Sequence, residues 1–414
     1  MAILFCAPHP TGYLPRHLDG ALRAAVGSSP VVILDGPRAV GKTTSAHRLA
    51  ASVVMLPRDR QLLQADAGGF LRALEPPVLV DEWQLAGTDV LWTVKEIVDE
   101  DPSPGRFLLT GSVEPATYGP TYPLTGRAVR LAMRPMTTAE LDGHGADPTF
   151  LDALVQRPDD KVPAVRTGRR GAAFDLGRLD RPGFPAARHL PDPRHFLDSY
   201  ASLVAQRAGD EGRDASRLLR TLRVMATLSG QALPDQRVWE AADITKVTWK
   251  HYDDLLLRTH VSAPLRALET NRLKRLTAYP KRFLADTALA LTLSDLDADG
   301  LRADPTVAGH YLEAYAVQQL RPQADLIGAT LRHVRTSAGE REVDIAIETA
   351  QGVIGVEVKL GVRPGPQDAR SLAWLRDHLG SRFHSGLVLH TGQDTHSLAD
   401  GVVAVPLTSV TGGA

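Results

Sequence analysis

The sequence predicts an α/β protein with more than one domain. In residues 1–141, short continuous apolar runs alternate with helix-patterned segments, which is typical of a parallel sheet covered by helices. A second group of strand-like runs follows a long helical region near the end of the chain. The length of 414 residues exceeds what one compact core usually holds and indicates two or three domains.

The first expected domain, residues 1–141, begins with apolar residues at helical spacing, which end at Gly27. Buried strands are expected at 31–34, 78–80 and 107–109. Helices are expected at 13–27, at about 42–52 and between the last two strands, where Val90, Leu91, Val94, Ile97 and Val98 recur at helical spacing. This alternation predicts a parallel α/β sheet.

The remainder of the chain divides into three parts. Residues 142–195 are rich in Gly, Pro, Asp and Arg and are interpreted as a linker or irregular segment with small ordered pieces. Residues 196–306 have a helical pattern. Residues 307–414 predict a smaller α/β unit, with helices at 311–320 and 368–379 and strands at 331–336, 342–347, 353–359 and 386–390.

Composition excludes some classes of function. The net charge of -1 provides no global field to attract nucleic acid or a membrane, so any basic surface has to be local. Cys6 is the only cysteine, which excludes an intramolecular disulfide and a cysteine-based zinc site within one chain. Apolar stretches fall short of the roughly 20 residues of a membrane helix, and the N-terminus lacks a signal-peptide pattern. We expect a cytoplasmic protein with no membrane partner.

A phosphate-binding loop follows the first buried strand. The run from Gly36 to Thr43 satisfies G-x-x-x-x-G-K-[ST] between a strand and a helix, the context that this motif requires. Glycines let main-chain N–H groups turn inward around phosphates, and a helix N-terminus adds positive potential. We expect Lys42 to reach the β- and γ-phosphates and the Thr43 hydroxyl to ligate Mg²⁺. The expected nucleotide-binding residues are Gly36, Pro37, Arg38, Ala39, Val40, Gly41, Lys42, Thr43, Thr44 and Asp81.

The catalytic candidates follow later strands. Asp81, which ends the strand at 78–80, is expected to hold magnesium through water, and Glu82 to polarise the attacking water. Thr110 is positioned to sense the γ-phosphate or orient water, or its hydroxyl satisfies a strand-end turn. Arg127 is a candidate arginine finger, acting in cis or on a neighbouring subunit, or is a solvated surface arginine.

Two short helices close together, within 238–257, suggest a helix-turn-helix. Polar residues stand early in the second helix, where a recognition helix contacts DNA: Thr245, Lys246, Thr248, Lys250 and His251. Asp253 and Asp254 in the same helix oppose DNA contact. The alternative is a winged-helix bundle used for packing or protein contacts.

Acidic residues and a lysine recur in the last domain. Asp344 and Glu357 are candidate metal carboxylates on successive strands, and Lys359 is a candidate for positioning or activating water. Strand alternation puts Glu357 and Lys359 on one face, and Glu313 on the preceding helix adds a further carboxylate. These residues suit metal-assisted phosphodiester hydrolysis, and the alternative is an ordinary charged sheet edge.

In the order of its motifs, the chain resembles a large prokaryotic family of AAA-type ATP-binding proteins, which join a P-loop ATPase domain to a C-terminal domain of unknown function. Matching segments cover nearly the whole chain: residues 34–44, 80–84, 109–112, 124–127, 134–141, 183–185, 279–287, Glu313, 342–344 and 357–359. The chain departs from the family at Arg181 and Pro182, where glycine is usual, and at 143–180, which is arginine-rich.

The resemblance implies an AAA-type ATPase core, a winged-helix region and a restriction-endonuclease-like C-terminal fold. It also implies ATP rather than GTP as the nucleotide, the roles given above for the P-loop domain, and a spatial cluster of the acidic residues and Lys359. The leading hypothesis is a Mg²⁺-dependent ATPase that acts as a switch or motor and is coupled to DNA, with homo-oligomer assembly as one form of output. The alternatives are a nucleotide-gated switch that binds a partner protein, and an ATP-controlled metal-dependent nuclease.

Overall fold

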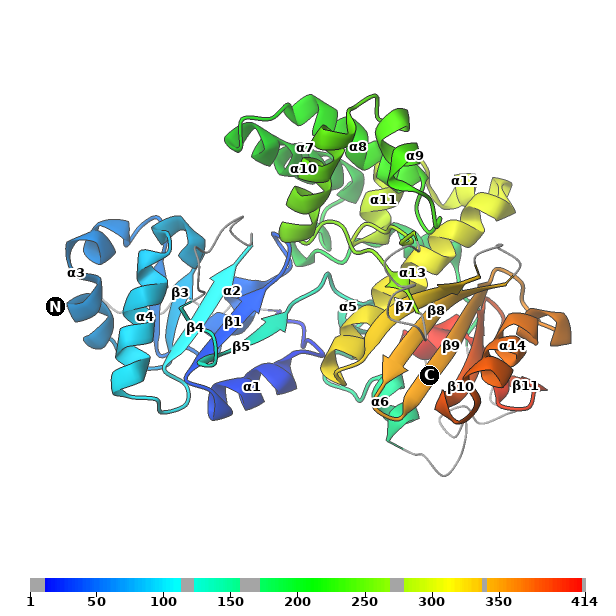
Figure 1. The fold of residues 1–414 in the computed structure, drawn as a ribbon, viewed down its shortest axis with the longest axis horizontal. Coiled ribbons are helices and arrows are strands. Elements are labelled where there is room, and N and C mark those ends of the chain that lie inside the picture. The colour runs from blue at the N-terminus through cyan, green and yellow to red at the C-terminus, as the bar shows by residue number, and fades with distance from the viewer. Residues whose placement is uncertain (1–11, 113–122, 157–171, 269–278, 337–340, 412–414) are drawn as a thin grey trace. The chain divides into compact units, whose positions relative to one another are not determined.

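The computed structural model describes residues 12–112, 123–156, 172–268, 279–336 and 341–411. The chain forms two compact units (Figure 1). The first contains residues 1–134 with 258–260, and the second contains 135–257 with 261–414. Among the described residues, none of the helices combines the length and the apolar character that crossing a bilayer requires.

The first unit is built on a five-stranded sheet in the order β2-β3-β4-β1-β5, in which all neighbours are parallel. The strands are β1 (Val31–Asp35), β2 (Ser52–Met55), β3 (Val78–Asp81), β4 (Phe107–Gly111) and β5 (Ala128–Ala132). The helices are α1 (Asp19–Ser28), α2 (Lys42–His47), α3 (Arg60–Arg72) and α4 (Asp89–Glu100), with the 3₁₀ turn η1 (Trp83–Ala86). The expected parallel α/β sheet is therefore confirmed.

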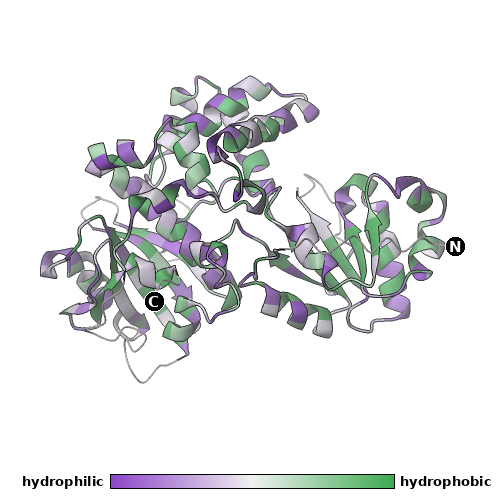
Figure 2. Ribbon diagram, turned by 180° about the vertical axis from the view of Figure 1, so that it is seen from behind, coloured by the Kyte–Doolittle hydropathy of each residue, from purple (hydrophilic) through white to green (hydrophobic). Residues whose placement is uncertain are grey.

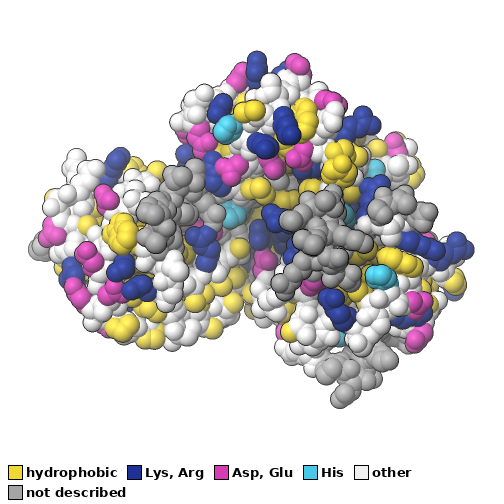
Figure 3. Space-filling view, viewed as in Figure 1, with side chains coloured by type: hydrophobic (Ala, Val, Ile, Leu, Met, Phe, Trp, Pro, Cys, Tyr) yellow, Lys and Arg dark blue, Asp and Glu magenta, His cyan; other side chains and the backbone are white. Residues whose placement is uncertain are grey.

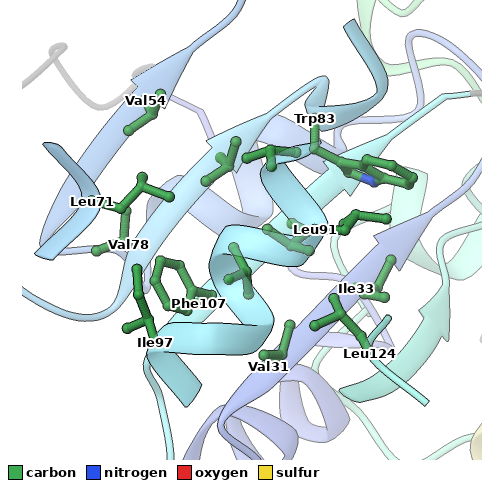
Figure 4. Packing of buried hydrophobic residues seen from close by; sticks show 14 of the residues in the cluster. Val31, Ile33, Val54, Leu71, Val78, Trp83, Leu91, Ile97, Phe107 and Leu124 are labelled. Carbon is green, nitrogen blue, oxygen red and sulfur yellow. The ribbon is translucent and has the colours of Figure 1, made fainter. Parts of the chain in front are cut away.

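One face of this sheet packs against α3 and α4. Alternate strand residues such as Val31, Ile33 and Phe107 meet Leu91 and Ile97 of α4 in one buried cluster (Figure 4). Each fully buried side chain of this kind stabilises the fold by about 1.5–3 kcal/mol. This core keeps the carboxyl ends of β1, β3 and β4 in fixed register, so that the loops after them meet at one edge of the sheet.

Several details of the first unit differ from the expectation. α1 begins at Asp19 instead of residue 13, and α3 was not expected. The helix expected at 42–52 ends at His47, and Ser52 begins β2, an edge strand of four residues rich in β-branched side chains. The other edge strand, β5, has exposed side chains at Val129 and Arg130 and no continuous apolar run. Short edge strands lack the buried pattern by which central strands are recognised, which is why neither was predicted.

The second unit contains a seven-stranded mixed sheet in the order β11-β12-β10-β9-β8-β7-β6. The strands are β6 (Arg266–Ala267), β7 (Thr330–Arg335), β8 (Glu342–Thr349), β9 (Gly352–Lys359), β10 (Phe383–His390), β11 (His396–Ala399) and β12 (Val402–Pro406). The long helix α13 (Pro305–Leu326) packs against β7, β8 and β9, and α14 (Arg370–Leu379) packs against β8, β9 and β10. The strands and helices expected in this part are present; β6, β11, β12 and the final helix α15 (Leu407–Val410) were not expected.

The rest of the second unit is helical. Its helices are α5 (Thr138–Leu141), α6 (Phe150–Val155), α7 (Pro193–Asp210), α8 (Ala215–Thr227), α9 (Asp235–Ala241), α10 (Lys246–Arg258), α11 (Thr287–Leu293) and α12 (Ala298–Ala303), with the 3₁₀ turns η2 (Leu176–Asp180), η3 (Pro185–Ala187), η5 (Pro366–Ala369) and η6 (Gly380–Arg382). Hydrophobic side chains dominate the sheet strands, whereas the helices carry hydrophilic residues on their outer faces (Figure 2). This amphipathic pattern is the signal from which the longer helices were predicted.

Candidate nucleotide site

The loop after β1 has the backbone conformation of a phosphate-binding turn. Gly36 has a φ of 153°, Ala39 of 62° and Gly41 of 99°, all positive. A Cβ on Gly36 would lie 2.1 Å from the carbonyl oxygen of Met133, so only glycine fits there. The non-glycine residue in the left-handed region, Ala39, is exposed, and such backbone strain is concentrated at functional sites.

Lys42 begins α2 and folds back over this loop. Its Nζ donates to the carbonyl oxygens of Gly36 and Pro37, each at 2.8 Å. Burial lowers the pKa of Lys42 to about 8, although the carboxylates of Glu82 and Asp35 act in the opposite direction. The side chain is thus a desolvated cation held at the mouth of the loop, where an anionic ligand would strengthen its charged form.

Asp81, at the end of β3, joins two hydroxyl groups. Its Oδ1 accepts a hydrogen bond from Thr43 Oγ1 at 2.7 Å and another from Thr110 Oγ1. Thr43 and Asp81, the two residues expected to hold magnesium, are therefore in direct contact. Thr110 is 1% exposed and its hydroxyl is engaged by the carboxylate, so its contact is with Asp81 rather than with a strand-end turn.

Glu82 follows Asp81 and is held by side chains that the sequence did not single out. Its Oε2 accepts from Ser112 Oγ at 3.0 Å and also from Gln84 Nε2. The backbone of Glu82 is left-handed, with a φ of 55°, which turns its carboxylate away from the direction of the strand. Arg38 Nε lies 3.4 Å from Ser112 Oγ, so the serine joins the loop to the acidic pair. A hydroxyl two residues after Thr110 was the available signal for Ser112.

The remaining loop residues differ in their exposure to solvent. Pro37 and Val40 are buried, Arg38 is exposed, and Thr44 lies half-buried in the first turn of α2. Val40 has a partner that sequence reasoning missed, the buried guanidinium of Arg16. This group donates to the carbonyl oxygens of Val40 and of Arg134, each at 2.7 Å.

Arg127 does not lie with these residues. It precedes Ala128, which pairs with Val31 at the amino end of β1, whereas the loop follows Asp35 at the carboxyl end. Four strand steps separate the two ends by about 13 Å. Arg127 is instead paired with Asp99 at the end of α4. This position does not favour an arginine finger acting in cis, because β5 runs parallel to β1 and Arg127 precedes the amino end of β5, away from the loop.

The predicted helix-turn-helix segment consists of α9 and α10 joined by residues 242–245. Trp249 and Tyr252 are buried, while Lys246, Lys250 and His251 are exposed; Thr245 is exposed and Thr248 half-buried. Asp253 is half-buried and burial raises its pKa, whereas Asp254 is exposed.

The four residues of the expected second site are carried by neighbouring elements of the second unit. Glu313 lies on α13, Asp344 on β8, and Glu357 and Lys359 on β9. Lys359 Nζ lies 2.7 Å from Glu357 Oε2, as strand alternation predicted. Burial raises the pKa of Glu357 to about 8, and the nearby Asp344 carboxylate acts in the same direction.

A lysine that sequence reasoning did not single out lies among these carboxylates. Lys281 Nζ is 2.9 Å from Glu313 Oε1, 2.8 Å from Glu342 Oε1 and 3.5 Å from Asp344 Oδ1. Within the described ranges, no group of three or more His, Cys, Asp or Glu side chains is arranged to hold a metal ion. The expected carboxylates are thus near one another, but an ammonium group lies among them.

Comparisons with known proteins identify domains along the chain. Residues 28–141 match the AAA domain, residues 182–300 match a domain of unknown function (DUF8612), and residues 308–410 match another domain of unknown function (DUF4143). An uncharacterized protein of Mycobacterium tuberculosis and one of Mycobacterium bovis are each 25% identical to the chain over 403 residues, covering 94% of this chain and 83% of the relative.

Solved structures that resemble the chain include P-loop proteins. A Walker-type ATPase of Pyrococcus abyssi aligns with a TM-score of 0.37 and 15% identity, over 66% of this chain and 94% of that one. A RuvB mutant of Thermotoga maritima aligns with a TM-score of 0.27 and 18% identity, over 63% of this chain and 93% of that one. These TM-scores are too low to establish a shared fold over the aligned lengths. The matched domains and the geometry of the loop show that the chain combines an AAA-type P-loop ATPase domain with a C-terminal domain of unknown function (DUF4143).

Proposed function

We propose that this chain is a Mg²⁺-dependent ATPase whose nucleotide cycle acts as a switch or motor coupled to DNA through the C-terminal half. The observation that carries the proposal is the contact network that joins the loop to the acidic pair. Thr43 and Asp81 share a hydrogen bond of 2.7 Å, and Glu82 beside them is oriented by Ser112. A P-loop that serves only as a turn has no need for an adjacent, oriented carboxylate.

In this mechanism the main-chain N–H groups of residues 36–41 bind the phosphates of ATP, and Lys42 compensates their charge. Thr43 and Asp81 would hold the magnesium ion, which would supply neutralisation of the negative charge on the phosphates. Glu82 accepts a proton from the attacking water, and its hydrogen bond with Ser112 keeps the carboxylate in one orientation. Thr110 fixes the Asp81 carboxylate through its own hydroxyl. Sensing of the γ-phosphate fits Ser112, which also contacts Arg38 of the loop.

An arginine finger, if the reaction uses Arg127, has to act on the site of a second copy. Arg127 lies at the amino ends of the strands of its own sheet, whereas the loop lies at their carboxyl ends. Its guanidinium is paired with Asp99. Release of that surface ion pair costs little, since water screens the attraction between exposed charges. This arrangement supports a homo-oligomeric form of the ATPase.

DNA coupling is assigned to the helix pair α9 and α10 as part of a winged-helix region. Lys246, Lys250 and His251 are exposed near the start of α10, where a recognition helix meets phosphates and base edges. Asp253 is half-buried, which leaves Asp254 as the exposed carboxylate of this helix that opposes the role. The C-terminal α/β part, with the restriction-endonuclease-like fold that the family resemblance implies, is proposed as the effector.

A second candidate is a nucleotide-gated switch that binds a partner protein. Acidic and basic side chains are interspersed over the described face of α7 to α10 (Figure 3). Asp243 and Asp254 are exposed in the same helix pair as Lys246 and Lys250. Mixed charge suits a protein partner better than a polyanion, for which a continuous basic surface is expected.

The experiment that separates these functions is an ATPase assay with and without duplex DNA, on wild type and Glu82→Gln. Turnover that rises with DNA supports the first function, and DNA-independent turnover without a DNA mobility shift supports the second. Glu82→Gln retains ATP binding but loses most turnover, because glutamine cannot accept the proton. Wild-type turnover in Glu82→Gln would remove Glu82 from the reaction.

A further inference from the structure

The carboxylate cluster of the second unit already contains cations. The acidic members are Glu313, Glu342, Asp344 and Glu357, and the basic members are Lys281, Lys359 and Arg335. We propose that Lys281 permanently occupies the cation position of this cluster, so that the cluster is a metal-free ion-pair site and not the metal centre that its carboxylates suggest.

The position of the ammonium group is the first argument. A metal ion shared by Glu313 of α13 and Asp344 of β8 would have to lie between their carboxylates. Lys281 Nζ is there, 2.9 Å from Glu313 Oε1 and 3.5 Å from Asp344 Oδ1, with Glu342 Oε1 at 2.8 Å. These are hydrogen-bonding and ion-pairing distances, and a divalent cation within about 2.0–2.6 Å of the same oxygens would overlap the ammonium group.

The backbone of Lys281 fixes the side chain in this place. Its N–H donates to Leu265 O at 3.0 Å, and Leu265 N–H donates to Lys281 O at 2.8 Å, which is a reciprocal antiparallel bridge. The side chain is 1% exposed, so moving it aside would require the residues packed around it to rearrange. Lys281 is therefore a built component of the cluster, unlike a surface lysine that swings aside when a metal binds.

The remaining oxygens do not form a ligand set for a divalent ion. Asp344 Oδ2 accepts a hydrogen bond from the main-chain N–H of Val358 at 2.9 Å. Glu357 Oε2 is paired with Lys359 Nζ at 2.7 Å. Glu357 Oε1 is buried with no hydrogen-bond partner among the described residues, but a divalent ion bound there would share the Glu357 carboxylate with the ammonium group of Lys359.

The proposal changes what the C-terminal part of the chain does. Without a metal position beside Asp344, the arrangement does not support metal-assisted phosphodiester hydrolysis, so the ATP-controlled nuclease loses its active site. Lys281 and its three carboxylate partners instead tie α13 to β8 by charge. The C-terminal part then acts as a binding or coupling module.

The test is Mn²⁺ binding to the nucleotide-free full chain, followed by electron paramagnetic resonance, on wild type and Asp344→Asn. Any Mn²⁺ that the P-loop unit holds contributes equally to both, so their difference reports on the cluster alone. We expect the two binding curves to coincide. A Mn²⁺ site present in wild type and absent in Asp344→Asn would overturn the proposal, whatever the behaviour of the other variants.

Substitution of Lys281 gives a complementary prediction. Lys281→Met keeps the length of the side chain but removes its charge, so the carboxylates are left without their central cation. We expect this variant to have a lower Tm and to gain Mn²⁺ affinity at least tenfold over wild type, with the Tm partly restored by Mn²⁺.

Two controls accompany this variant. If the double variant that carries both Lys281→Met and Asp344→Asn loses the gain in Mn²⁺ affinity, the new Mn²⁺ site includes Asp344. Lys95→Met, which removes a partly exposed lysine paired with Asp99 on α4, is the matched control; it should leave the Mn²⁺ affinity unchanged and lower the Tm less. Unchanged Mn²⁺ affinity in folded Lys281→Met would contradict the proposal.

Discussion

At the scale of residues, the sequence could predict those parts of the nucleotide site that belong to local motifs, but not those that depend on contacts between distant residues. Lys42, Thr43 and Asp81 belong to local patterns whose spacing and order are readable, and the structure brings them into contact or close range. Ser112 and Arg16 act through contacts with residues distant in the sequence, at Glu82 and Val40. A single sequence gives no sign of such pairs, because they depend on how strands and loops are placed in space.

Removal of the Ser112 hydroxyl should impair turnover more than binding. In Ser112→Ala, Glu82 loses one of the two groups that orient its carboxylate. We expect kcat for ATP to fall by about tenfold or more with KM changed by less than about threefold. Steady-state kinetics of Ser112→Ala and of Ser103→Ala, a control at an exposed turn, would measure this. Equal loss of kcat in both variants would remove Ser112 from the catalytic arrangement.

The pKa of Lys42 predicts a pH dependence of nucleotide binding. Burial lowers this pKa to about 8, so the free protein loses the ammonium charge as the pH rises through that value. ATP binds the charged form, and above pH 8 the affinity should fall by up to about tenfold per pH unit, with proton uptake on binding. Calorimetry at pH 7 and pH 9 in two buffers of different ionisation enthalpy measures both effects. Lys42→Arg stays charged, so its Kd for ATP should change little between pH 7 and pH 9. A wild-type Kd that is the same at both pH values would refute the prediction.

At the scale of elements, a buried arginine braces the phosphate-binding loop. Arg16 lies just before α1 and binds the carbonyl of Val40 in the loop and that of Arg134 after β5. Met133 adds a hydrogen bond of 2.7 Å from its N–H to Asp35 O, and its own carbonyl lies against Gly36. The loop is thus supported by Arg16, near the start of the first unit, and by Met133, near the end of β5.

Loss of this brace should weaken ATP binding. Arg16→Ala leaves the buried Val40 carbonyl without its donor, at a cost of about 1–3 kcal/mol, and permits alternative loop conformations. We expect the Kd for ATP to rise by about tenfold, measured by calorimetry or by fluorescence with a labelled nucleotide. Arg23→Ala, on the exposed face of α1, serves as the control. Wild-type affinity in Arg16→Ala would show that the loop needs no support from this side chain.

Asp286 connects several elements of the second unit. Its carboxylate accepts from Gly183 N–H at 2.7 Å, from Leu289 N–H at 2.9 Å and from Gln318 Nε2 at 3.1 Å. It thereby joins the segment before η3, the start of α11 and the middle of α13. Gly183 is needed there because a Cβ would lie 2.6 Å from Met136 O. Motifs that are far apart in the sequence therefore meet at one buried carboxylate.

Substitution of Asp286 should destabilise the protein strongly. Asp286→Ala removes a helix cap and leaves buried donors without an acceptor, which together lower the free energy of unfolding by about 2–4 kcal/mol. Urea unfolding followed by circular dichroism would measure the change. Asp297→Ala, which removes the exposed cap of α12, is the control and should lose less. A smaller loss in Asp286→Ala than in Asp297→Ala would contradict the role given to this network.

The elements that could be predicted are those with strong periodic patterns. The central strands β1, β3 and β4 are continuous apolar runs, and α4 and α14 bury one regular stripe. Edge strands such as β2, β5 and β11 are short and half exposed, so their side chains follow no single period. The position of Lys281 could not be predicted either, because its partners come from α13 and β8 and its own segment has no regular pattern.

At the scale of the whole molecule, the first compact unit ends earlier than the sequence pattern suggests. The expected domain runs to residue 141, whereas the compact unit ends at Arg134. Residues 138–141 form α5, whose Thr138 N–H donates to Gln319 Oε1 at 2.8 Å and whose Thr138 Oγ1 lies 2.5 Å from Tyr315 Oη. The chain therefore passes from the Arg16 brace to a docked helix of the second unit with few residues between.

The central claim is that the loop, Lys42 and the acidic pair form a working ATP site. The most direct test is calorimetric binding of ATP with Mg²⁺, together with phosphate release, on wild type and Lys42→Ala. We predict saturable binding and turnover in wild type and the loss of both in Lys42→Ala, with the fold intact by circular dichroism. Wild-type protein that neither binds nor hydrolyses ATP, or Lys42→Ala with unchanged affinity and turnover, would contradict the account.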